Sequence, residues 1–278
     1  MIALVLALGS SLAYGCADFL GGLGARKAHV LRTVLIAAPA SLVIELLLWP
    51  VLGASFGAAT LWWGAASGVA SAAAFALLYR TLAIGPMSVL SPVTALVSAV
   101  LPVGVGLLQG AHLGTAGLVG LPLALVAVVL VSAGHGAGTA PPARTALLLA
   151  CGAGAAIALQ LIFLHQTPSG SGVAPLIVGR AVSSTVTLAA AGLMHRGLGT
   201  ERPRYAIAAS AGVLDSIANL LFLLAARGGD LAVVAVIVAL YPASTVLLAR
   251  GVLAERIHRG QLIGLGAAVV AVSLLALA

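Results

Sequence analysis

The segment YAIAASAGVLDSIANLLFLLAA, residues 205–226, is an unbroken run of mostly apolar side chains that contains a single acidic residue, Asp215. At 1.5 Å per residue, a helix of this length is about 33 Å long, which matches the ~30 Å hydrocarbon core of a bilayer. The run is too continuous for the alternating strands of a membrane barrel. It therefore predicts a transmembrane helix with one carboxylate near its middle.

The same character extends along all 278 residues, of which 62% are hydrophobic and only 7% charged. Soluble domains are about half apolar and a quarter charged. Ten apolar runs of membrane-spanning length can be placed at residues 2–23, 30–52, 58–83, 87–108, 113–133, 144–164, 173–194, 205–226, 231–250 and 260–277. The sequence thus predicts an all-α membrane protein with ten transmembrane helices and no room for a soluble catalytic domain.

An internal repeat divides these helices into two groups. Aligning residues 67–132 with residues 211–276, a constant shift of 144, gives 17 identities in 66 positions, including Gly68 on Gly212. Because each group holds five helices, an odd number, the second must be inverted in the membrane. Inverted repeats are a common plan of secondary transporters.

The predicted organisation is a first five-helix repeat over residues 1–133, a linker over residues 134–143 and a second five-helix repeat over residues 144–278. The linker, GHGAGTAPPA at 134–143, is rich in glycine and proline, as connecting segments are.

Residues at the boundaries of these helices form a pattern that is similar to that of a known family. Gly85-Pro86 and Gly229-Asp230 open the fourth and ninth helices, and Ala254-Glu255-Arg256-Ile257 is followed by Gln261-Leu262-Ile263-Gly264. This pattern resembles the EamA-like family of the drug/metabolite transporter superfamily, although the first half has Gly110-Ala111-His112, without the glutamate. The resemblance implies two five-helix repeats and transport of a small metabolite, without naming the substrate.

Four charged residues lie within the predicted helices and away from their ends: Asp18, Glu45, Arg180 and Asp215. Such a residue costs about 2.5–3.5 kcal/mol on insertion scales and is a functional candidate by default. Asn219 lies one turn after Asp215, and Tyr14 one turn before Asp18, so each pair shares a helix face. We predict that the two pairs, Tyr14 with Asp18 and Asp215 with Asn219, line a substrate and ion pathway. The alternatives are a hydrogen-bonded structural role for Asp215 and solvation at the membrane surface for Asp18.

Glu45 and Arg180 suggest a different role. Each lies about seven residues from a helix end that faces the same side of the membrane, which is a depth of ~10 Å. If their helices are neighbours, the two charges can neutralise each other. We predict that they form a structural ion pair.

The resemblance further implies that the first, third, fourth, sixth, eighth and ninth helices surround the pathway. Those helices contribute the polar residues Tyr79, Thr94, Gln160 and Tyr241. Packing or placement at the membrane surface is the alternative for each of them.

The sequence predicts no cofactor, no metal and no nucleic-acid partner. The six histidines are scattered among loops and helix ends, and no phosphate-binding GxxxxGK[ST] loop occurs. The expected partners are the lipid bilayer and a small-molecule substrate. The leading hypothesis is a secondary transporter in the plasma membrane that exports a small metabolite by alternating access. One alternative is a proton-coupled multidrug or organic-cation exporter. The alternative from another class is a membrane enzyme or lipid-handling protein.

Basic residues predict the orientation. The odd-numbered connections and the adjoining helix ends hold Arg26, Lys27, Arg32, Arg80, Arg144, Arg196, Arg202, Arg204, Arg250, Arg256 and Arg259, whereas the even-numbered ones hold only Arg227. Basic residues in short loops stay in the cytoplasm. Both termini are therefore predicted outside the cytoplasm, although the resemblance implies cytoplasmic termini.

Overall fold

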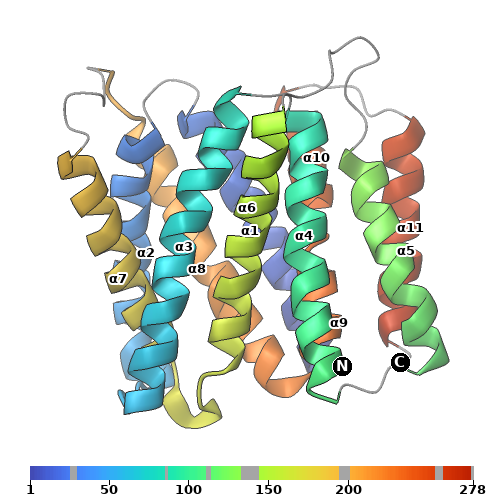
Figure 1. Cartoon of the computed structure of the whole chain (residues 1–278), viewed down its shortest axis with the longest axis horizontal. Coiled ribbons are helices and arrows are strands. Elements are labelled where there is room, and N and C mark those ends of the chain that lie inside the picture. Colours follow the sequence, from blue (N-terminus) through green and yellow to red (C-terminus); the bar gives the residue numbers. More distant parts are fainter. Residues whose placement is uncertain are drawn as a thin grey trace.

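The computed structural model of the chain is an all-helical bundle whose helices run along one common direction (Figure 1). It describes residues 1–25, 30–84, 87–110, 114–132, 144–193, 201–253 and 259–276. The helices are α1 (Ile2–Ala25), α2 (Val30–Leu52), α3 (Ala58–Ile84), α4 (Met87–Leu108), α5 (Thr115–Ser132), α6 (Arg144–His165), the 3-10 turn η1 (Ser169–Ser171), α7 (Ala174–Leu193), α8 (Tyr205–Gly228), α9 (Leu231–Val238), α10 (Tyr241–Leu253) and α11 (Arg259–Ala276).

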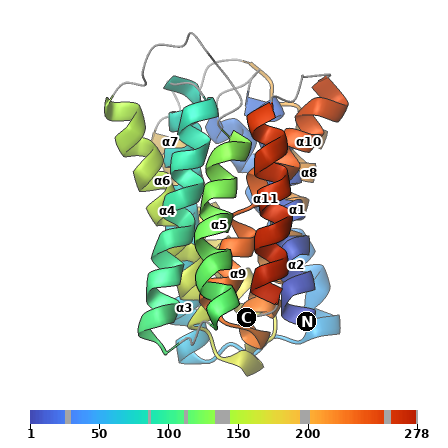
Figure 2. The ribbon, with the colours of Figure 1, turned by 90° about the vertical axis from the view of Figure 1, so that its right-hand side faces the viewer.

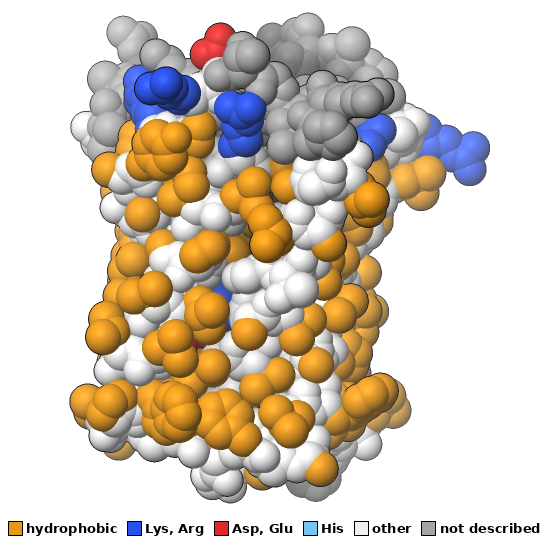
Figure 3. All heavy atoms as spheres, turned by 90° about the vertical axis from the view of Figure 1, so that its left-hand side faces the viewer, with side chains coloured by type: hydrophobic (Ala, Val, Ile, Leu, Met, Phe, Trp, Pro, Cys, Tyr) orange, Lys and Arg blue, Asp and Glu red, His pale blue; other side chains and the backbone are white. Residues whose placement is uncertain are grey.

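Helix length and composition are those of a multi-pass membrane protein. Six helices, α1, α2, α3, α6, α7 and α8, are long and apolar enough to cross a bilayer. Within the described residues, shorter apolar helices cover Val93–Leu108, Thr115–Leu130, Leu231–Thr245 and Arg259–Leu275. The space-filling view shows hydrophobic side chains over most of the height of one face, as a lipid-facing surface requires (Figure 3).

The predicted ninth helix, residues 231–250, is not one continuous helix. It is divided into α9 and α10 by a turn at Ala239 and Leu240. Pro242, the second residue of α10, has no amide hydrogen to donate to the carbonyl of Val238, and its ring crowds that carbonyl. The segment is apolar throughout, so hydropathy predicts one continuous helix. Hydropathy carries no information about a missing backbone N–H, and the break was therefore not predicted.

The helices of the two halves pack in corresponding pairs. The contact between α1 and α8 corresponds to the contact between α6 and α3. The contact between α2 and α8 corresponds to the contact between α7 and α3. Helix α4 contacts α6, and the α9–α10 pair contacts α1. Direct contacts between equivalent helices complete the set: α2 with α7, α4 with α9, and α5 with α11, which stand side by side in Figure 2. Exchanging the two halves converts each contact between non-equivalent helices into another member of the set and leaves the three contacts between equivalent helices unchanged.

Two glycines that align under the 144-residue shift lie where helix backbones cross closely. A Cβ atom on Gly212 would lie 2.0 Å from the carbonyl oxygen of Ala37 on α2, and one on Gly68 would lie 2.3 Å from that of Gly179 on α7. Small residues allow such close approach of helix backbones. The crossings fix how α8 meets α2 and how α3 meets α7.

The two ends of the bundle differ in charge. Arg32 Nη1 donates to the carbonyl oxygen of Glu201 over 2.8 Å, which joins the first and seventh connections at one end. At the other end Arg227 Nη2 donates to Ser171 Oγ over 2.7 Å, and both chain termini lie there (Figure 1). On the face seen in Figure 3, the prominent Lys and Arg side chains gather at the former end.

Candidate functional site

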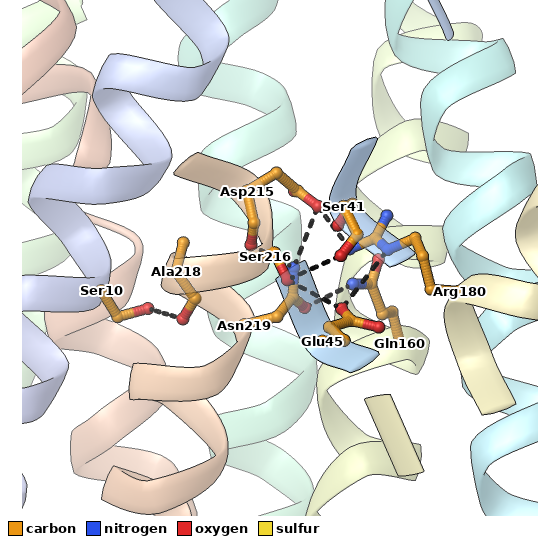
Figure 4. Close-up of polar contacts among 9 residues, drawn as sticks. All are labelled: Ser10, Ser41, Glu45, Gln160, Arg180, Asp215, Ser216, Ala218 and Asn219. Atoms are coloured by element: carbon orange, nitrogen blue, oxygen red, sulfur yellow. Dashed lines mark hydrogen bonds and ion pairs between the residues drawn. The ribbon is translucent and has the colours of Figure 1, made fainter. Parts of the chain in front are cut away.

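Three buried charges meet between α2, α7 and α8 and form what we call the charged cluster: Glu45, Arg180 and Asp215 (Figure 4). Arg180 Nη2 donates to Asp215 Oδ2, and Arg180 Nε lies 3.7 Å from Glu45 Oε1. One guanidinium thus serves two carboxylates. With all three groups ionised, the cluster carries one negative charge in excess.

Side chains of α2 and α8 support the two acids. Ser216 Oγ donates to Glu45 Oε1 over 3.1 Å and contacts the carbonyl oxygen of Ser41 at 3.3 Å. The second carboxylate oxygen of Glu45, Oε2, has no hydrogen-bonding partner among the described residues, although this side chain is only 1% exposed. An unpaired buried oxygen of this kind is costly, so the cluster is not fully compensated.

A chain of amides extends the cluster to α6. Asn219 Nδ2 donates to the backbone oxygen of Asp215 over 2.8 Å and lies 3.3 Å from its Oδ2. Gln160 Nε2 in turn donates to Asn219 Oδ1 over 2.8 Å. The acid on α8 is therefore linked to α7 through Arg180 and to α6 through Asn219 and Gln160.

A cavity, the central cavity, lies beside the cluster; the space between atoms there is about 600 Å³, a figure that includes open solvent. Its lining comes from α1, α3, α4, α6, α8, α9 and α10: Tyr14, Asp18, Ala74, Phe75, Leu78, Ser98, Ile157, Gln160, Leu161, Asp215, Ala235, Val238, Ala239 and Tyr241. Apart from two carboxylates, the amide and three hydroxyl groups, the walls are apolar. This is the usual composition of a small-molecule site.

Two smaller cavities share walls with the central one. Asp18 and Asp215 also line a second cavity of about 370 Å³, together with Arg180. Glu45, Arg180, Gln160 and Asn219 line a third of about 220 Å³. The charged cluster and its amides therefore separate the three spaces.

The structure brings most of the predicted pathway residues together. Tyr14, Asp18, Gln160, Asp215 and Tyr241 line the central cavity, and Asn219 lies behind it in the hydrogen-bonded chain. Thr94 is fully buried and donates to the carbonyl oxygen of Ala150 over 3.2 Å, so it joins α4 to α6 without lining these cavities. The side chain of Tyr79 lies outside the described residues, as do the predicted linker and the Glu255-Arg256 motif.

Sequence reasoning missed part of the cluster. It assigned Arg180 to Glu45 and gave Asp215 no cationic partner, whereas the structure places Arg180 against both acids. It also passed over Ser41 and Ser216. A signal was present, because Ser41 lies one turn before Glu45 and Ser216 directly follows Asp215.

The fold and this site define a multi-pass membrane protein with a solute-sized cavity beside buried charges. Residues 144–277 match the model of the EamA-like transporter family. The second half of the chain thus belongs to the EamA-like transporter family, a family of membrane transporters for small solutes, and the predicted resemblance is confirmed.

Comparison of structures extends the likeness to the whole fold. Chains of solved structures match the protein, and one of them, a crystal structure, has a TM-score of 0.76 over 99% of this chain and 96% of its own. The two sequences are 14% identical, so this likeness concerns the fold alone. Among curated proteins no match was found.

Proposed function

We propose that the protein is a secondary transporter that moves a small organic solute across the plasma membrane through the central cavity. The observation that carries this proposal is the place of the cavity, which is lined by helices of both halves in the middle of an apolar bundle. Transporters with inverted repeats bind their substrate at such an interface between repeats, near the bilayer midplane.

The proposed mechanism is alternating access between two inverted five-helix repeats. The corresponding helix contacts support it, because a pair of repeats related by a two-fold axis produces every contact twice or places it on the axis. The matched close approaches at Gly68 and Gly212 support the same relation. Rocking one repeat against the other would then expose the cavity to each side of the membrane in turn.

We further propose that the protein is an exporter whose termini lie outside the cytoplasm. Export follows from the family resemblance, whose members include exporters of metabolites and toxic compounds. The orientation follows from charge. The exposed side chains of Arg80, Arg144, Arg202, Arg204 and Arg259 all belong to odd-numbered connections, and basic residues in short connections are retained in the cytoplasm.

Reconstitution tests the proposed function. Proteoliposomes containing the full chain are given a mixture of labelled metabolites, with and without a pH gradient, and internal label is measured over time. Saturable uptake that responds to the gradient is the expected result. Label that enters in linear proportion to its concentration and equally fast in protein-free liposomes contradicts the proposal.

A further inference from the structure

The central cavity is negatively charged. Among the described residues, its lining contains two carboxylates, Asp18 and Asp215, and no Lys, Arg or His. Arg180 stands behind Asp215 and is shared with Glu45. Its single positive charge is therefore already balanced within the charged cluster.

Asp18 has no partner of its own. In the described part of the chain, no hydrogen bond and no ion pair involves its carboxylate. A carboxylate in a largely apolar wall is costly when its charge is not compensated. The cavity therefore has room and charge for a cation opposite Asp18.

The Tyr241 side chain is a second, independent sign of a ligand. It lines the cavity from the first turn of α10 and is only 9% exposed. Its hydroxyl group nevertheless has no hydrogen-bonding partner among the described residues. A hydroxyl group without a partner, on a side chain that lines the cavity, is available to a bound molecule.

The break between α9 and α10 adds an acceptor to the same wall. Val238 and Ala239 line the cavity at the end of α9. Because Pro242 has no N–H, the Val238 carbonyl lacks the donor that an unbroken helix would supply. Carbonyl groups at such interrupted helices bind cations in other transporters.

We propose that the central cavity binds a small organic cation, a protonated amine with an apolar body, held by Asp18 and by oxygens at the α9–α10 break. This assignment rests on the proposed function and names its class of substrate. The ammonium group pairs with Asp18, and its remaining N–H groups donate to the Val238 carbonyl and the Tyr241 hydroxyl oxygen. The rings of Tyr14, Phe75 and Tyr241 supply faces that attract a cation.

Binding to the purified full chain tests this assignment with two probes that share one apolar body. Phenethylamine, which is cationic at neutral pH, and 3-phenylpropionate, which is anionic, are titrated by calorimetry into the wild-type protein. Saturable binding of the amine, at least tenfold tighter than that of the carboxylate, is expected. Equal binding of the two probes, or tighter binding of the carboxylate, overturns the assignment without any mutation.

Variants locate the site. Asp18→Asn should weaken amine binding at least tenfold while leaving the thermal unfolding temperature unchanged or raising it, because no hydrogen bond is lost and a buried charge is removed. The matched control is Asp230→Asn, which makes the same charge change at an exposed position before α9. Pro242→Ala restores an N–H at the break and should weaken binding severalfold. Amine binding that is equal in wild type and Asp18→Asn overturns the assignment.

The same experiments separate this assignment from the transport proposal. Saturable amine binding in a protein that moves no solute in proteoliposomes would support the cation site and contradict transport. Gradient-driven uptake of neutral or anionic solutes without binding of the amine would support transport and overturn the cation site.

Discussion

A methyl group added at Gly212 tests the helix crossing on which the charged cluster depends. In Gly212→Ala the new Cβ would lie 2.0 Å from the carbonyl oxygen of Ala37 and 2.7 Å from its carbonyl carbon. Ordinary contact begins at 3.4 Å, so α8 and α2 must separate by about 1.4 Å, the difference between the two distances. Both clashing atoms are backbone, so no side-chain rotation relieves the contact.

Two opposing effects set the size of the change. Replacing glycine by alanine inside a helix stabilises the fold by roughly 0.5–1 kcal/mol, because the unfolded chain loses conformational freedom. Forcing an extra carbon into a filled contact costs typically 1–3 kcal/mol. With backbone on both sides the cost should be near the upper end, so we expect a net loss of about 2 kcal/mol, or ~4–8 °C in Tm.

Thermal unfolding in detergent, followed by tryptophan fluorescence, measures the change. Gly104 on α4 is the matched control, because nothing lies within 4 Å of its Cβ position; Gly104→Ala should leave Tm unchanged or raise it. Gly68→Ala should lower Tm about as much as Gly212→Ala, since its Cβ would meet the Gly179 oxygen at 2.3 Å. A rise in Tm for both Gly68→Ala and Gly212→Ala would refute the reasoning.

Three further changes test the charges and the orientation. Arg180→Gln leaves Glu45 and Asp215 buried without a cation and should lower the free energy of unfolding by about 3–5 kcal/mol. Glu45→Gln preserves the bond from Arg180 to Asp215, so chemical unfolding should show a smaller decrease in the free energy of unfolding for this variant. Asp215→Asn should express and fold but abolish or uncouple transport, and wild-type transport rates across pH in this variant would assign Asp215 a structural role. A phosphatase fused after Ala278 should be active outside the cytoplasm, whereas a fluorescent cytoplasmic reporter with no phosphatase activity would show the opposite orientation.

Much of the helical architecture could be predicted from sequence because a bilayer leaves few alternatives. Apolar runs of sufficient length must be helices there, and this places α1, α2, α3, α6, α7 and α8 within a few residues of their observed ends. The break at Pro242 required a different rule, that a proline removes a backbone donor. Hydropathy and local backbone chemistry are thus separate signals. Hydropathy alone predicts one continuous helix over residues 231–250.

The candidate site was predictable residue by residue but not as a network. The cost of burying a charge singled out Asp18, Glu45, Arg180 and Asp215 one at a time. Which acid meets Arg180 depends on helix neighbours and on rotation about each helix axis, and apolar helices in lipid carry little periodicity from which to infer rotation. The sequence therefore predicted the pair with Glu45 and missed the second contact with Asp215.

The internal repeat aligns packing positions of the two halves but not the acidic residue of α8. Under the shift of 144 residues the packing glycines Gly68 and Gly212 coincide, but Asp215 falls on Ser71.

Two more positions diverge in the same way: Asn219 falls on Phe75, and Pro242 on Ser98. Phe75 and Ser98 line the central cavity, and Ser71 lines the third, so these positions of the first half face the cavities too. Positions that hold the helices together are shared between the halves, whereas positions that face the cavities have different chemistry. A cation bound as proposed would lie between Asp18 of α1 and the broken helix of the second half.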